Sequence, residues 1–259
     1  MNIHFLRHAT SIITINGLTL LVDPMLSEAG AMDPVANAGN QKRIPLIDLP
    51  MSERELKQLL QDIDAVLVTH THRDHWDARA IELLPKDLPI LCQPEDEQSI
   101  KQAGFSSVTP IASQYSWQGV EIQRTRGQHG TGEIGQKMGP VSGFFLQAEG
   151  EPSLYIAGDT VWCPEVQSAL ATFSPEAVML NAGAAEFLVG GPITMTAEDV
   201  SRVCRAVPTA RVIAVHFETV NHCRLTRAAL KQHLEEEGLA DQVQIPADGA
   251  VINLAHTKD

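Results

Sequence analysis

Residues 68–77 read VTHTHRDHWD and contain three of the chain's 10 histidines together with two aspartates. The preceding run DAVLVT, residues 64–69, is apolar and rich in β-branched side chains, which predicts a buried strand. The cluster of polar side chains therefore begins where a core strand is expected to end. A fold keeps so many polar groups at such a place only if something binds them.

The spacing within this cluster predicts metal ligands. Side chains two residues apart on a strand point the same way, so His70 and His72 can present two imidazole nitrogens to one cation. Asp74 and His75 follow in a predicted turn and point elsewhere, which suits a second cation close to the first. The pattern H-x-H-x-D-H therefore predicts the first half of a two-metal centre, with a coincidental polar loop as the alternative.

Three more candidate ligands stand at the ends of predicted strands. His129 lies in GQHGTG after the strand VEIQRT, Asp159 ends LYIAGD, and His216 follows RVIAV. Each of them alone has an ordinary alternative, namely a loop histidine, a turn aspartate or a core histidine bonded to a carbonyl. All three at strand ends predict that the chain completes the metal centre that residues 68–77 begin.

In this order, THTHRDH, His129, the strand ending in GDT and the strand ending in His216 resemble the metallo-β-lactamase superfamily. The likeness covers nearly the whole chain and implies an α/β (α+β) fold, a four-layered αββα sandwich, in a single domain over residues 1–259. FLRHAT near the N-terminus and GPITMTAED at 191–199 resemble the branch that includes ascorbate-6-phosphate lactonase and the phospholipase D-type hydrolases.

The resemblance also implies which residue does what. One metal would be bound by His70, His72 and His129, the other by Asp74, His75 and His216, with Asp159 bridging the two. Asp23, in LLVDP at 20–24, would brace the metal loop from behind the ligands. His8 would lie near the site, although a buried structural histidine is an equal alternative.

Two cations lower the pKa of a shared water and hold a substrate oxygen beside it. We therefore expect a dinuclear metal-dependent hydrolase whose metal-bridging hydroxide cleaves a small-molecule ester, lactone or phosphodiester, with Asp74 as the catalytic residue. Zn²⁺ is the expected metal, and Mn²⁺ or iron would accept the same ligands. The alternatives are an iron-dependent redox enzyme on the same fold, a nuclease of the tRNA-processing type, and a protein that uses the metals for stability alone.

Composition limits the partners. The formal net charge of −13 repels phosphate backbones, which argues against extended nucleic-acid binding and for a small-molecule substrate. His222 and Arg224 are candidates for the substrate pocket, and Arg224 would receive an anionic group; a loop imidazole and a surface ion pair are the alternatives. The sequence has no apolar run long enough to span a membrane and no signal pattern, which predicts a cytoplasmic location.

The other elements follow from local patterns. Asn16-Gly17 predicts a hairpin turn, Ser52 with Glu55 predicts a capping box, and the Gly- and Pro-rich stretch 24–50 is either a binding loop or a tolerated insertion. A mixed sheet fits better than an all-parallel one. Further strands are predicted at 89–92, 120–125, 141–148, 153–157, 177–180, 211–215 and 243–253, and helices near 77–84, 94–103, 196–206 and 226–237.

Overall fold

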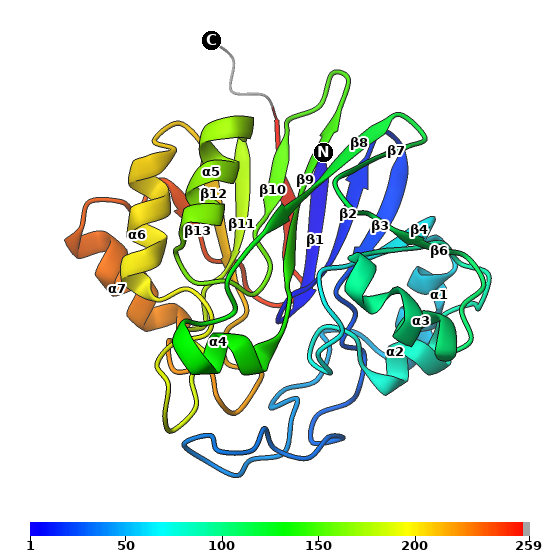
Figure 1. Cartoon of the computed structure of the whole chain (residues 1–259), viewed down its shortest axis with the longest axis horizontal. Helices are drawn as coiled ribbons and strands as arrows, with labels where there is room; N and C mark the ends of the chain where they lie inside the picture. The colour runs from blue at the N-terminus through cyan, green and yellow to red at the C-terminus, as the bar shows by residue number, and fades with distance from the viewer. Residues whose placement is uncertain (256–259) are drawn as a thin grey trace.

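The computed structural model describes residues 1–255 and contains two seven-stranded sheets that pack face to face (Figure 1). In the first sheet the order is β14-β1-β2-β3-β4-β5-β6, and in the second it is β13-β12-β11-β10-β9-β8-β7. The first sheet contains β1 (Asn2–Arg7), β2 (Thr10–Ile15), β3 (Leu18–Val22), β4 (Ala65–Val68), β5 (Ile90–Cys92), β6 (Val108–Pro110) and β14 (Val251–Asn253). The second contains β7 (Gln114–Trp117), β8 (Val120–Arg126), β9 (Ser142–Ala148), β10 (Leu154–Ile156), β11 (Ala177–Asn181), β12 (Arg211–Val215) and β13 (Val243–Gln244).

Helices cover the outer face of each sheet, so the predicted four-layered αββα sandwich is confirmed (Figure 1). The first sheet carries α1 (Glu53–Leu60), α2 (Ala78–Leu83) and α3 (Glu97–Gln102), the last preceded by the 3₁₀ turn η1 (Pro94–Asp96). The second carries α5 (Pro164–Phe173), α6 (Ala197–Ala206) and α7 (Arg227–Glu236). The remaining helix, α4 (Gly132–Met138), lies at the lower end of the sandwich in the view of Figure 1.

Three apolar clusters hold these layers together. The central one joins the inner faces of the two sheets and includes Ile13 from the first and Phe144 from the second. In the outer clusters Leu56 of α1 packs with Val66 of β4, and Leu170 of α5 packs with Val178 of β11. Most central strands are buried on both faces, which explains why they are continuous apolar runs in the sequence.

Both sheets are mixed, as the sequence predicts. β1, β2 and β3 are antiparallel neighbours, whereas β3 to β6 run parallel. In the second sheet β7 to β10 are antiparallel and β10 to β13 are parallel. The carboxyl ends of the parallel strands of both sheets meet at the lower edge of the sandwich, where the long loop 24–50 also lies (Figure 1). No helix in the described range 1–255 is long and apolar enough to cross a bilayer.

The hairpin at Asn16-Gly17 is confirmed, because Ile15 pairs with Leu18 across it, and the Ser52 capping box is present. One predicted strand, 243–253, is wrong as a single element. Its first part, β13, pairs with β12 in the second sheet, and its last part, β14, pairs with β1 in the first. Pro246 cannot donate to a ladder and Gly249 has a φ of 80°, so the chain turns between them and crosses from one sheet to the other.

Candidate metal centre

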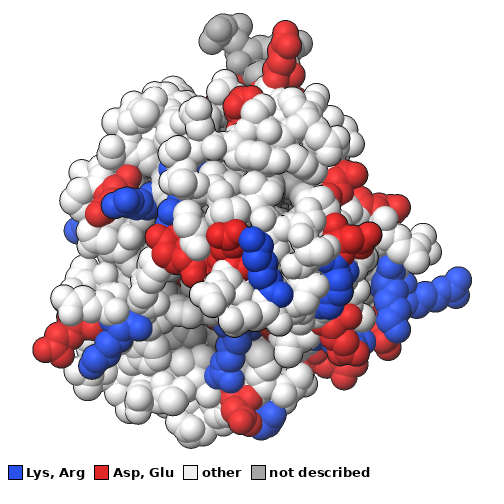
Figure 2. Space-filling model, turned by 45° about the vertical axis from the view of Figure 1, so that its right-hand side comes forward, with Lys and Arg blue, Asp and Glu red and all other residues white. Residues whose placement is uncertain are grey.

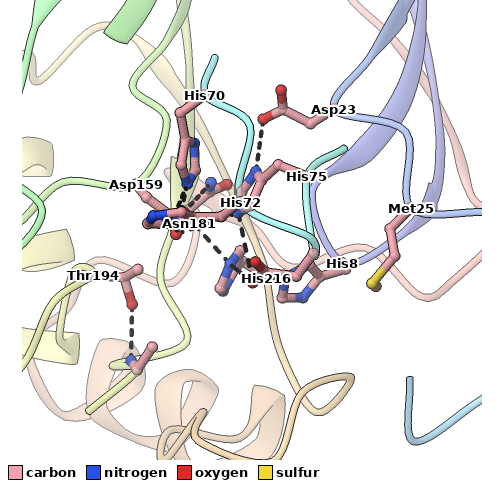
Figure 3. A network of polar contacts seen from close by, with 12 residues as sticks. His8, Asp23, Met25, His70, His72, His75, Asp159, Asn181, Thr194 and His216 are labelled. Carbon is pink, nitrogen blue, oxygen red and sulfur yellow. Dashed lines mark hydrogen bonds and ion pairs between the residues drawn. The ribbon is translucent and has the colours of Figure 1, made fainter. Parts of the chain in front are cut away.

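All seven predicted ligands converge at the carboxyl ends of the strands, between the two sheets. Figure 3 labels five of them, His70, His72, His75, Asp159 and His216. The first sheet brings residues 70–75 after β4, and the second brings His129, Asp159 and His216 after β8, β10 and β12. These ligands are 8% exposed or less, except His72, which is partly exposed. The side chains fall into groups whose potential ligand atoms lie within 4.8 Å of one another.

The first group contains His70, His72 and His129, the three predicted to share one metal. His70 Nε2 lies 3.0 Å from His72 Nδ1. His129 donates from Nδ1 to the carbonyl of Ile193 at 2.7 Å, which leaves its Nε2 lone pair facing the group.

The second group contains Asp74, His75 and His216, and it also contains His8. His8 is fully buried, and its Nε2 lies 3.2 Å from Asp74 Oδ2. His216 Nε2 and His75 Nε2 each lie 3.8 Å from the same carboxylate oxygen. The resemblance predicted only that His8 would lie near the site. In the structure it lies as close to this group as the predicted ligands do.

Asp159 faces both groups. Its Oδ2 lies 3.5 Å from His129 Nε2 and 3.3 Å from His75 Nε2, and its Oδ1 lies 3.4 Å from His216 Nε2. Asn181, the last residue of β11, donates an amide proton to Oδ1 at 2.7 Å and fixes the carboxylate. This position is compatible with the predicted bridging role of Asp159.

Asp23 supports the histidines from behind. Its carboxylate accepts the backbone N–H of Thr69 and the Thr69 hydroxyl, both at 2.7 Å, and the Nδ1 proton of His75 at 2.9 Å. Because the Thr69 hydroxyl proton is used by Asp23, its oxygen accepts from His70 Nδ1 at 3.1 Å. Asp23 thus sets the tautomers of His75 directly and of His70 through Thr69.

The backbone is unusual where three of these residues leave their strands. His8, Asp23 and His216 have φ values of 61°, 43° and 72°, in the left-handed region that non-glycine residues rarely adopt. The His216 N–H also donates to the His8 carbonyl at 2.8 Å, which ties the first sheet to the second. Such conformations persist only where the surrounding structure enforces them, and they gather at functional sites.

The site combines strong opposite charges in a buried place. Burial, and then the positive charge of His75, hold the pKa of His70 well below its ordinary value. Burial opposes charge on His75 as well, but the attraction of Asp159 and Asp74 outweighs it and raises the pKa of His75 well above its ordinary value. Burial likewise opposes the ionised form of Asp159, yet the imidazoles around it keep its pKa well below the ordinary value. The negative charge that holds a proton on His75 would equally attract a divalent cation.

This donor set fits metal ions. His70, His75 and His129 each use Nδ1 in a hydrogen bond, so each offers Nε2 to the site. His216 Nε2 is buried and has no hydrogen-bond partner among residues 1–255. Imidazole nitrogens with carboxylate oxygens are the ligands that zinc, manganese and iron accept, and outer partners that fix the tautomers are a usual feature of such centres.

A cavity of about 200 Å³ opens onto the two groups. Asp74, His72 and Asp159 form its polar side, and His222 and Phe187 line it with their rings 5.7 Å apart. Arg224, the other residue predicted for the substrate pocket, does not line this cavity. Its guanidinium pairs instead with Glu186, with Nε 3.5 Å from Oε1, and its side chain is 55% exposed.

The loop 24–50 forms part of the cavity wall through Val35 and Ala36, so it is a site loop and not a free insertion. Asn221 fixes it, because its side chain bonds the N–H and carbonyl of Val35 at 2.9 and 3.1 Å and the carbonyl of Asn40 at 2.9 Å. Arg7, fully buried, donates to three carbonyls of the same loop at 2.7 to 3.0 Å. The buried guanidinium of Arg7 thus holds the loop in place.

Sequence reasoning missed Thr69, Asn181 and Asn221. Asn181 ends an apolar strand, AVMLN, and that is the signal by which Asp159 and His216 were found, so the same rule could have identified it. Thr69 and Asn221 act through hydrogen bonds to residues far away in the chain, which no local pattern predicts.

Comparison with known proteins agrees with this geometry. Residues 2–216 match the family described as the beta-lactamase superfamily domain. The protein YddR of Bacillus subtilis (strain 168), of the group UPF0173, is 36% identical over 252 residues, which are 96% of this chain and 98% of YddR. A possible metal-dependent hydrolase from Veillonella parvula DSM 2008 is 35% identical with a TM-score of 0.94, and the match covers 98% of this chain and 99% of that one. An isothiocyanate hydrolase from Delia radicum gut bacteria is 37% identical with a TM-score of 0.92 and the same coverage.

Proposed function

Because the chain belongs to the beta-lactamase superfamily and is a metal-dependent hydrolase of that fold, we propose that it is a dinuclear enzyme that hydrolyses small isothiocyanates. The observation that carries the dinuclear part is the pair of donor groups that Asp159 joins. The substrate class rests on the isothiocyanate hydrolase, which is 37% identical along 98% of this chain. The predicted likeness to the branch of ascorbate-6-phosphate lactonase stays a prediction.

Two divalent ions would be held by His70, His72 and His129 on one side and by Asp74, His75 and His216 on the other, with Asp159 between them. Zn²⁺ remains the expected metal, with Mn²⁺ and iron as alternatives. Bound ions of this kind supply a water molecule acidic enough to be a nucleophile near neutral pH.

In the proposed reaction, residues of the chain would orient the attacking water and transfer protons to and from the reacting atoms. Asp74 lies at the cavity, and His8 bonds its Oδ2 at 3.2 Å, so its other oxygen is free to accept a proton from the attacking water. The water oxygen adds to the central carbon of R–N=C=S, and the nitrogen takes a proton. The resulting thiocarbamate loses carbonyl sulfide and leaves the amine R–NH₂. His222 lines the same cavity, and we assign it the relay of a proton to the nitrogen.

The charges of the surface argue against the nuclease alternative. Figure 2 shows acidic and basic side chains interspersed on the face it presents, with no continuous basic stretch there. With a formal net charge of −13, the molecule repels a long phosphate backbone. A compact cavity of about 200 Å³ also favours a small substrate over a polymer.

The test measures amine release from isothiocyanates by metal-loaded protein, with and without a chelator, beside a panel of lactones, esters and bis-aryl phosphodiesters. Chelator-sensitive release of amine is expected, and Asp74→Asn should abolish it while the protein stays folded and still binds an ion at His70, His72 and His129. Turnover of a lactone, ester or phosphodiester without turnover of any isothiocyanate would reassign the substrate. No hydrolysis at all, together with an iron-dependent absorbance, would favour the redox alternative.

A further inference from the structure

A second and larger hollow adjoins the cavity of the metal centre. It has a volume of about 520 Å³, and Met138 and Phe187 line both it and the cavity. The two hollows are therefore neighbours that share these two lining residues. Together they are within the size range of small-molecule sites.

The walls of this outer hollow are mostly apolar, with Asn37, Glu133 and Lys137 as the polar lining residues. Ile134 and Met138 of α4 form one side, and Phe187, Leu188 and Val189 form the other. Leu188 is 69% exposed and Val189 82% exposed, and with Val251 they are the exposed large hydrophobic side chains of residues 1–255. Soluble proteins leave apolar side chains together on the surface chiefly where they bind something.

The two sides are held at a fixed separation. Gly190 has a φ of 111°, and a Cβ at this position would lie 2.9 Å from Ile134 Cβ, so the loop backbone packs directly on α4. The N–H of Leu188 donates to the carbonyl of Asn37 at 2.8 Å, which joins this loop to the anchored loop 24–50. The hollow is thus formed before a ligand arrives.

We propose that the outer hollow binds the apolar substituent of the substrate while the reacting group lies at the metal centre. This rests on the proposed function and adds to it that the preferred isothiocyanates carry a phenyl-sized or longer alkyl group. The two hollows share Met138 and Phe187 as lining residues, and this adjacency favours the substituent of a bound substrate as the occupant over a lipid surface or a second copy of the chain.

The first experiment compares kcat/KM for methyl and 2-phenylethyl isothiocyanate in the metal-loaded protein and in the double variant Leu188→Asp, Val189→Asp. The wild type should prefer the phenylethyl compound, and the variant should lose about tenfold of that preference, as expected when part of the burial of a phenyl group is lost. Turnover of the methyl compound should stay within about twofold, since it does not reach the outer hollow. Val251→Asp, at a position 60% exposed on β14, is the matched control and should change neither rate.

A second measurement does not depend on turnover. Fluorine NMR of 2-(4-fluorophenyl)ethanol should show line broadening with the wild type and with Val251→Asp, and a sharp line with the double variant. If neither isothiocyanate is hydrolysed, the proposed function is refuted. Broadening of the fluorine line would still support the hollow as an apolar site. An unbroadened line with the wild type would overturn the inference, and so would a variant whose only change is a lower oligomeric mass in solution.

Discussion

The metal centre and the loops in front of it differ in how the chain builds them. The centre consists of polar residues placed directly after strands, and several of them are fixed by hydrogen bonds from neighbouring residues, such as Asn181 to Asp159. The outer wall consists mainly of apolar residues from the loop 24–50, α4 and residues 187–189. A backbone bond from Leu188 to Asn37 joins the two loops, and the side chain of Asn221 anchors the loop 24–50. The framework should therefore decide whether the reaction occurs, and the loops should decide on which molecule.

The largest effect is expected from Asp159→Asn, because this carboxylate faces both donor groups. We expect the purified variant to hold at most one metal ion per chain. Its kcat/KM should fall at least about 100-fold, because replacing a residue that only supports a metal ligand can already cost up to that much. Metal content by mass spectrometry and the amine-release assay measure the two quantities. Glu149→Gln, an exposed acid on the surface, is the control. A variant with two bound ions and wild-type activity would remove Asp159 from the centre.

Asp23→Asn should have the next largest effect and tests whether the layer behind the ligands belongs to the centre. An amide cannot accept both Thr69 bonds and the His75 proton, so the tautomer of His75 is no longer fixed. We expect metal affinity to fall about 10- to 100-fold. Competition with a coloured chelator measures it, with the exposed Asp62→Asn as control. Unchanged affinity would show that Asp23 serves the fold alone.

The difference between the two regions also explains how far the sequence could predict the structure. Polar residues that end apolar strands are visible in a single sequence, and the convergence of the seven candidate ligands was predicted from them. The sandwich was predicted from the resemblance to the metallo-β-lactamase superfamily. Their roles as ligands, the single domain over 1–259 and the cytoplasmic location stay predictions. The contacts of the loops could not be predicted in this way. Asn221 and Val35 are 186 residues apart in the sequence, and no periodicity indicates the hydrogen bond between them. The division of 243–253 between two sheets was also missed, although Pro246 and Gly249 mark the break within the segment.

Asn221→Ala should have a smaller effect that is confined to the loop region. The change removes three hydrogen bonds to the loop 24–50 and leaves buried polar groups unpaired, which should cost about 1–3 kcal/mol of folding stability. With the wall at Val35 loosened, KM should rise several-fold while kcat changes less, and the Val35 amide should exchange faster with solvent. Asn2→Ala, exposed on β1, is the control. A fall in kcat with unchanged KM would mean that the loop acts on the metal centre itself.

The smallest effect is expected from Arg224→Ala, and it sharpens the boundary between the two regions. Arg224 follows the cavity residue His222 by two positions, yet its exposed guanidinium pairs with Glu186 and does not line the cavity. Exposed ion pairs contribute little, so we expect less than about a twofold change in kcat/KM for an uncharged substrate. His222→Ala, whose side chain does line the cavity, should lower kcat at least about tenfold, since positioned proton transfer contributes that much or more. If Arg224→Ala instead weakens binding of an anionic substrate strongly, the arginine moves on binding and the substrate carries a negative charge, which would overturn the proposal of a neutral isothiocyanate.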